Sequence, residues 1–464
     1  MDEPSSRRLR AGPRLAFALL LGLAAATPSL AGAALKSPLA LDDWAFAATS
    51  HYRTFSAGFG SQARARPVSA LWDWAQFRFF DSHAIPHLVV LAALNAAAAI
   101  LFWRVLERWV PQRVAVLTAL AWVALSNRGS TRLWATTSPN VGALVLLLAA
   151  LLVVSARPFT KGRLAIALAL LALGTLAYEG VIAIGVVALV AVIWTRGPRR
   201  LRVRWAALVV GVMAAVGGWV LINSPKVGTS PPPFRNLSHL ASAHFGSAVL
   251  PGPPRLLALV VLIAIVWSIA MVVLPAFDAW IEHRLVGVGL AVVVLGSAPF
   301  AVVGFPFSGS GFFDRGNLFA DLGTALVYGA LLSMVMRLPW PAVGVAVATA
   351  ALVAIAAPNV TSVRDYVRAG RDGRRFLAAV DTLPVDVRTR GPVTFLPLPD
   401  HGGVAEFLAD YDISSALALR YHTGVPFPRA TMAVSATGFR RAVGPVYELV
   451  GRRLILRGAA DAMR

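Results

Sequence analysis

The sequence predicts an all-α polytopic membrane protein of about eleven transmembrane helices that ends in a small α/β domain. Of its 464 residues, 57% are hydrophobic and only 14% are charged, whereas soluble domains carry roughly 25% charged residues. A bilayer requires about twenty apolar residues per helix. We expect helices, some of them short, at 15–34, 87–106, 114–126, 140–155, 164–177, 180–194, 205–222, 255–275, 285–304, 318–336 and 339–357.

Two of these segments allow a second interpretation. The first follows a cluster of arginines and ends in small residues, so a cleaved signal peptide is an alternative to a membrane helix. The run from Leu164 to Trp194 is interrupted at Tyr178-Glu179-Gly180. It is too long for one straight span, and an ionised Glu179 in lipid would cost several kcal/mol. We therefore expect two short helices that meet at an outer turn.

The basic residues predict the orientation. Arginine and lysine concentrate in the loops on the side of the N-terminus, for example in the arginine-rich stretch at 196–204, and such loops stay in the cytoplasm. We expect a multi-pass protein of the inner (plasma) membrane with a cytoplasmic N-terminus and an outer C-terminal tail. The basic side chains behind the net charge of +21 then contact anionic lipid head groups, and no nucleic-acid partner is predicted. The chain has no cysteine, which excludes disulfides and thiolate chemistry.

The domain boundary is predicted at the change in composition at Pro358-Asn359. Residues 1–357 form the membrane domain, with a long first outer loop at 35–86, and residues 358–464 form an outer soluble domain. In this tail we expect an amphipathic helix through 374–380, a buried strand at 393–396, and one short element each at 404–408 and 417–421.

Polar residues that interrupt the apolar sequence all fall on the outer side of this topology, so we expect one convergent site. The adjacent Asp42 and Asp43 open the first outer loop. Simpler roles exist for each: the acidic pair caps a helix that starts at Trp44, the tryptophans belong to the aromatic belt, and Asp314 pairs with Arg315. The remaining members of the set are Arg66, His87, Trp134, Glu179, His239 and His244.

Group transfer from a lipid-bound phosphate would use such a set. A carboxylate near the membrane surface acts as general base on an acceptor hydroxyl. A guanidinium, here Arg66 or Arg315, holds the departing phosphate through paired donors and balances its growing charge. Apolar grooves between helices take the lipid chain.

In the order of its motifs, the chain resembles the C-type membrane glycosyltransferases, which use polyprenyl-phosphate sugars or related lipid donors. The resemblance spans most of residues 15–357. The matching motifs are LDDWAF (41–46), ARPVSALW (65–72), PHLVVLAALNAAAA (86–99), Trp134 before Ser-Pro-Asn, Tyr178-Glu179 between two apolar runs, and FDRGNLFADLG (313–323).

The resemblance implies a GT-C-like fold and transfer of a sugar from a polyprenyl-phosphate donor to a glycan, lipid or protein acceptor outside the cytoplasm. It implies that Asp43 or Asp42 is the general base and that Arg66 lies near the donor phosphate. We add Arg315 and His87 as phosphate-binding candidates. Residues that contact donor or acceptor are expected to be Trp134, Glu179, Trp72, His239 and His244. Relatives often carry Lys-Glu where this chain has Tyr178-Glu179, so no lysine binds phosphate there.

No cofactor is expected. Asp42, Asp43, His51 and Glu179 would suit a divalent cation if they converged, but no metal-binding spacing supports one. Two other functions remain open. One is a transporter or flippase of a lipid-linked sugar, which the lack of an internal repeat and of mid-membrane charges disfavours. The other is a non-catalytic assembly protein.

Overall fold

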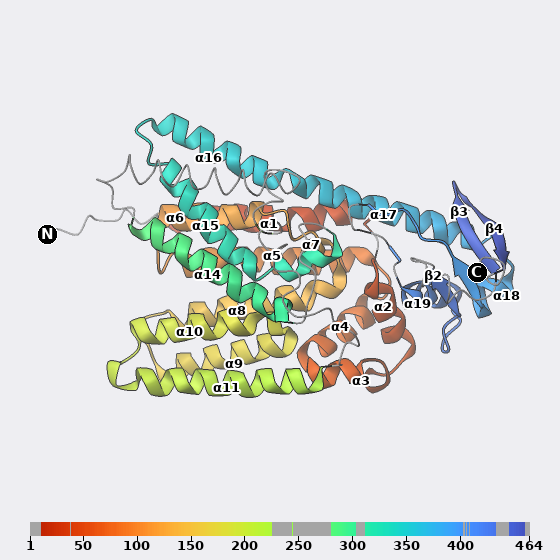
Figure 1. Cartoon of the computed structure of the whole chain (residues 1–464), viewed down its shortest axis with the longest axis horizontal. Coiled ribbons are helices and arrows are strands. Elements are labelled where there is room, and N and C mark those ends of the chain that lie inside the picture. The colour runs from red at the N-terminus through yellow and green to blue at the C-terminus, as the bar shows by residue number, and fades with distance from the viewer. Residues whose placement is uncertain are drawn as a thin grey trace.

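The computed structural model describes residues 11–37, 39–224, 244, 280–302, 311–401, 404, 406–407, 409–432 and 445–459. The described chain is mostly helical and ends in a small sheet. Helices run along the long axis of the molecule, and the sheet lies at one end of it (Figure 1). The predicted fold class is therefore confirmed at the level of a helical bundle with a small C-terminal sheet.

Within the described residues, seven helical segments are long and apolar enough to cross a membrane, so the predicted number of eleven is not confirmed. They include helices α1 (Ala11–Ala34), α5 (Ala84–Leu106), α8 (Ser138–Val154), α10 (Ile182–Arg196), α11 (Arg202–Asn223), α14 (Trp280–Val302) and α16 (Pro341–Ala356). Three further predicted segments form the shorter helices α6 (Gln112–Ala124), α9 (Lys161–Ala177) and α15 (Ala320–Val335). The predicted segment 255–275 lies outside the described residues.

The outside of the bundle is apolar. Leu19 and Leu20 on α1 are 63% and 66% exposed, and Leu221 and Ile222 on α11 are 77% and 83% exposed. Aliphatic side chains exposed over such a surface would be a liability in water but match lipid chains. The described helices therefore have the surface of a membrane protein.

Glycines let α14 and α15 approach closely. A Cβ atom on Gly323 of α15 would lie 2.3 Å from the carbonyl oxygen of Gly289 on α14, and one on Gly296 would lie 2.5 Å from the backbone nitrogen of Ala320. Helices in lipid gain their packing energy from such close contacts between small residues. The pair holds the short helical turn η5 (Phe312–Asn317), which precedes α15, against the bundle.

The predicted interruption near Glu179 is confirmed. Helix α9 ends at Ala177, Tyr178 is extended, and the short turn η2 (Glu179–Val181) leads into α10. The loop between α6 and α8 likewise contains two short turns, α7 (Ser130–Leu133) and η1 (Ala135–Thr137).

The first long loop forms three helices, α2 (Asp42–Tyr52), α3 (Phe55–Ala65) and α4 (Pro67–Phe80). Arg66 lies between α3 and α4, because Pro67 lacks a backbone N–H and favours the first position of a helix. The three helices lie toward the same end of the molecule as the sheet (Figure 1).

Helix α17 (Pro358–Val380) follows α16 after Ala357 and extends to the sheet (Figure 1). The change in composition thus coincides with a new, amphipathic helix. It is followed by α18 (Val385–Arg390), β1 (Val393–Phe395), α19 (Asp410–Tyr421), β2 (Ala430–Met432), β3 (Pro445–Val450) and β4 (Arg453–Ala459).

The sheet has the strand order β2-β1-β3-β4, with β1 parallel to both neighbours and β3 antiparallel to β4. The strand predicted at 393–396 is confirmed as β1, and the element at 417–421 is the end of α19. At 404–408, the described residues show only an isolated bridge between His401 and Val404. Phe376, Phe395 and Ile413 are buried between sheet and helices and form the core of this part.

Candidate functional site

The C-terminal part packs on the helix that carries the acidic pair. Helix α19 lies against α2, and the Tyr411 hydroxyl donates to Asp42 Oδ1 at 2.6 Å. The Tyr52 hydroxyl donates to the carbonyl of Ala418 at 3.0 Å. A residue of the C-terminal part therefore contacts one of the two candidate bases directly.

The two carboxyl groups of the acidic pair have different surroundings. Asp43 is 1% exposed and accepts hydrogen bonds from the backbone N–H groups of Ala40 at 3.0 Å, Thr136 at 2.9 Å and Ala135 at 3.3 Å. Burial raises the pKa of Asp43 to about 7 against the opposing effect of these donors. Asp43 thus joins the start of α2 to η1, whereas Asp42 is only half-buried. Neither aspartate is the N-cap residue, which is Leu41.

Arg315 lies beside this pair of helices. Its guanidinium is centred 4.9 Å from the ring centroid of Trp134, which is 2% exposed. Burial and the Asp42 carboxylate raise the pKa of Tyr411, whereas Arg315 lowers it. Arg315 is therefore close enough to act on the hydroxyl that contacts Asp42.

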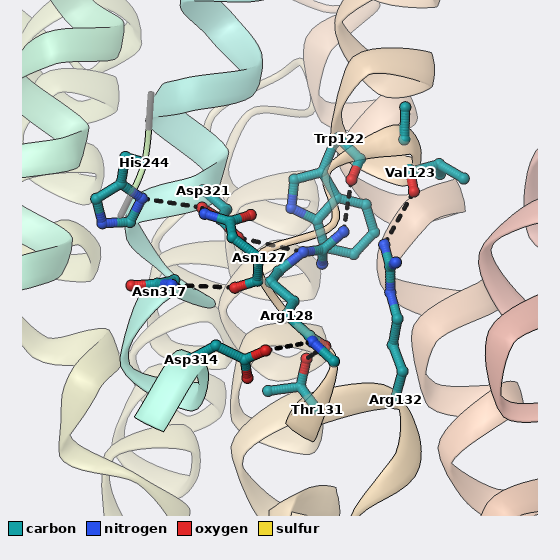
Figure 2. Close-up of polar contacts among 12 residues, drawn as sticks. Trp122, Val123, Asn127, Arg128, Thr131, Arg132, His244, Asp314, Asn317 and Asp321 are labelled. Atoms are coloured by element: carbon teal, nitrogen blue, oxygen red, sulfur yellow. Dashed lines mark hydrogen bonds and ion pairs between the residues drawn. The ribbon is translucent and has the colours of Figure 1, made fainter. Parts of the chain in front are cut away.

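A buried polar cluster fixes the position of η5, which carries Arg315 (Figure 2). Asp314 accepts from the backbone N–H groups of Gly129 at 2.6 Å and Ser130 at 3.0 Å. Asn317 donates to the carbonyl of Asn127 at 3.0 Å. Burial raises the pKa of Asp314 to about 7. These bonds attach η5 to the loop that continues to Trp134, so the arginine and the ring beneath it are held together.

The same cluster contains a fully buried ion pair. Arg128 Nε lies 3.2 Å from Asp321 Oδ2, and neither side chain is exposed. Asp321 Oδ1 also lies 3.0 Å from His244 Nδ1 and accepts from the Asn127 amide at 2.9 Å. The guanidinium of Arg128 stacks 3.9 Å from the ring centroid of Trp122 (Figure 2). His244 thus belongs to this interior cluster.

Arg66 and Glu179 form an ion pair that joins the first loop to the break between α9 and α10. The Arg66 guanidinium also lies 5.3 Å from the ring centroid of Tyr178. Both Arg66 and Arg315 act electrostatically on the Tyr178 hydroxyl. The two predicted phosphate-binding arginines are therefore both close enough to one tyrosine to act on its hydroxyl.

The Arg66–Glu179 pair lines a pocket of about 810 Å3. The wall of the pocket comes mainly from α3, α10, α11 and α14. Arg66 and Glu179 are the only charged residues among the fifteen that line it. Leu221, whose side chain is 77% exposed on the outside of the bundle, also lines it. The pocket is therefore mainly apolar, contains one ion pair and reaches the lipid-facing surface.

Three other predicted residues lie elsewhere or outside the described residues. His87 is fully buried, with Nδ1 2.7 Å from the Gln76 amide and Nε2 3.1 Å from the carbonyl of Asp81. Trp72 donates to Gln76 at 2.7 Å and lines a separate apolar groove. His239 lies outside the described residues.

The sequence reasoning missed three contributors. Tyr411 gave no signal, because its contact with Asp42 spans 369 positions. For Gln62 and Asp73 the sequence carried a weak signal, because Asp73 is the one acidic residue of the mostly apolar helix α4. Asp73 is 1% exposed and accepts from Gln62 at 2.9 Å, and burial raises its pKa to about 8.

The described residues contain no group of three or more histidine, cysteine or acidic side chains that could hold a metal ion. Comparison with protein families, with curated proteins and with solved structures found no match for the chain. The function is therefore argued from the site alone.

Proposed function

We propose that the chain is a membrane glycosyltransferase that transfers a sugar from a polyprenyl-phosphate donor to an acceptor outside the cytoplasm. One observation carries the proposal: an arginine, held by an ion pair with Glu179, lines a pocket that is otherwise mainly apolar. A polyprenyl phosphate has one anionic head and a long apolar chain, and it matches a pocket with both kinds of lining. Leu221 marks the side from which the chain would enter from the bilayer.

Arg66 keeps capacity to bind a phosphate. A guanidinium has five N–H donors, and the bond with Glu179 uses one nitrogen, Nη2. Glu179 and the Tyr178 ring hold the group in place before the ligand arrives. Such pre-organisation lowers the entropic cost of binding.

The chemical step needs a base for the acceptor and a positive charge for the departing phosphate. The bond between the anomeric carbon and the phosphate oxygen breaks, and the phosphate leaves with the bonding electrons. The acceptor oxygen forms the new glycosidic bond and gives its proton to a base. We assign the base to Asp42, which is half-buried and oriented by Tyr411. Arg66 and Arg315 stabilise the charge that grows on the phosphate. Asp43, whose oxygens are occupied by backbone donors, positions α2.

The test uses purified protein in detergent with a polyprenyl-phosphate hexose and a panel of acceptors. Release of polyprenyl phosphate is measured for the wild type, Asp42→Asn and Arg66→Lys. Lysine lacks the forked donor arrangement, so Arg66→Lys should lower turnover more than donor affinity. Arg64→Lys, at an exposed arginine near the end of α3, is the matched control and should keep full activity.

One observation favours a second candidate, a transporter or flippase of a lipid-linked sugar. The Arg128–Asp321 pair and His244 are buried inside the bundle, and interior ionisable groups often mark ion or proton pathways in transporters. A flippase breaks no bond. If no acceptor yields release while vesicles with the protein still move the lipid between leaflets, this candidate replaces the enzyme.

A further inference from the structure

Gln62 lines the same pocket as Arg66, and two residues of α4 hold its side chain by hydrogen bonds. Gln62 and Arg66 are one helical turn apart in sequence, and both line the pocket. The Gln62 amide nitrogen donates to Asp73 Oδ2 at 2.9 Å and to Ser69 Oγ at 3.2 Å. The Ser69 hydroxyl itself donates to Asp73 Oδ2 at 3.2 Å.

These bonds determine which atom of the amide serves the pocket. Ser69 uses its proton on Asp73 Oδ2, which leaves Oδ1 as the oxygen for any proton that this buried acid holds. Ser69 Oγ and Asp73 Oδ2 therefore offer lone pairs to Gln62. The NH2 group is therefore the side of the amide that faces them, and its donors are used. Because Asp73 and Ser69 are 1% and 6% exposed on α4, they cannot swing away to release it. The remaining polar atom, Oε1, is a hydrogen-bond acceptor on a side chain that lines the same pocket as Arg66.

We infer that Gln62 selects the head group of the lipid: its Oε1 accepts a hydrogen bond from a sugar hydroxyl next to the phosphate that Arg66 binds. Both side chains line one pocket, so a single ligand that carries a phosphate and a sugar hydroxyl next to it would engage both. A bare phosphate at neutral pH offers mainly acceptors and gains little from this oxygen. The pocket would thus prefer the glycosylated donor to the polyprenyl phosphate that remains after transfer. This inference rests on the proposed function.

Asp73 and Ser69 are positioning residues in this arrangement. An unrestrained glutamine offers either face of its amide, whereas the held amide offers only the acceptor. A site built around one polar atom discriminates against ligands that leave this atom unpaired. Product release is helped by the same feature, since the hydroxyl leaves the pocket with the sugar.

The test compares two probes of equal chain length, a polyprenyl-phosphate hexose and bare polyprenyl phosphate. Dissociation constants are measured in detergent without acceptor, for the wild type and for Gln62→Met, which keeps the length of the side chain but lacks the acceptor. We expect binding of the hexose probe to weaken about three- to tenfold, the value of one neutral hydrogen bond, and binding of the bare phosphate to stay unchanged. Ser56→Ala, an exposed position of the same helix, should change neither.

Unchanged binding of bare phosphate also shows that the variant is folded. Equal effects on both probes, or no effect on the hexose probe, would overturn the role of Gln62 and leave the proposed function intact. If the wild type binds neither probe, or if Arg66→Ala leaves the binding of both unchanged, the proposed function fails and this inference fails with it.

Discussion

Asparagine substitutions at Asp43 and Asp42 should separate positioning from chemistry. Asp43 Oδ2 accepts from Ala40 and Ala135, and Oδ1 accepts from Thr136. Asparagine keeps one oxygen, so its NH2 group faces at least one of these N–H groups. One buried donor without a partner costs about 1–3 kcal/mol, and Asp43→Asn should lower the free energy of unfolding by that amount. Asp43→Ala removes every acceptor and should cost at least about 3 kcal/mol.

Asp42→Asn should lower turnover and leave stability nearly unchanged, the opposite of Asp43→Asn. The residue is half-buried, and the asparagine oxygen still accepts from Tyr411, so the free energy of unfolding should change by less than about 0.5 kcal/mol. Turnover should fall by at least about a hundredfold, because an amide cannot take a proton. Asp43→Asn should keep turnover per folded molecule within about tenfold of the wild type.

The assay combines denaturant unfolding in detergent with release of polyprenyl phosphate, normalised to folded protein. Tyr411→Phe serves as the intermediate case: it keeps the ring but removes the hydroxyl that orients Asp42. We expect it to shift the pH profile of turnover without loss of stability. An inactive Asp43→Asn with wild-type stability, together with an active Asp42→Asn, would refute the assignment of the base.

Three further predictions concern topology and buried charge. A reporter enzyme that works only outside the cytoplasm should be active when fused after Arg464 and inactive at Arg200; the reverse would place the site in the cytoplasm. Arg128→Ala should cost about 3–5 kcal/mol, because it leaves Asp321 buried without its ion pair, and the double variant with Asp321→Leu should recover part of this in unfolding measurements. Burial raises the pKa of Asp73 from 3.8 to about 8, so the folded protein keeps a proton that the unfolded chain releases, and stability falls as the pH rises from about 4 to about 8. Asp73→Asn should weaken this dependence in unfolding at a series of pH values, and an unchanged slope would contradict it.

Part of the site was predictable because it depends on local sequence. Pro67 predicts that a helix starts after Arg66, and the interruption around Glu179 follows from the cost of a charge in lipid. The alternation of helices predicts the side on which each loop lies. For these reasons Asp42, Arg66, Glu179 and Arg315 were predicted together as members of one site.

The surroundings of Asp43, His87 and His244 could not be predicted from the sequence, because their hydrogen-bond partners come from other segments of the chain. All three are polar residues that the predicted topology places on the outer side, as a binding residue would be, but each is buried against partners from other segments. A buried polar group must form a hydrogen bond with whatever partner the fold provides. That partner stands at no fixed spacing along the sequence. The same holds for Gln62 and Tyr411, whose importance comes from Asp73 and Asp42.

The amino-acid sequence by itself determined that this is a mainly helical membrane protein and where most of the apolar helices of the described residues lie, because hydrophobicity, proline and charge act over a few neighbouring positions. It did not predict that the first long loop forms three helices. Tertiary structure alone decided which carboxylate is buried, which arginine lines an apolar pocket and which glutamine amide is held by a buried aspartate. Those properties arise from contacts between distant segments, such as Tyr411 with Asp42 and Arg66 with Glu179. Burial and pairing set the charge and the hydrogen-bonding capacity of a side chain, and both exist only once the chain has folded.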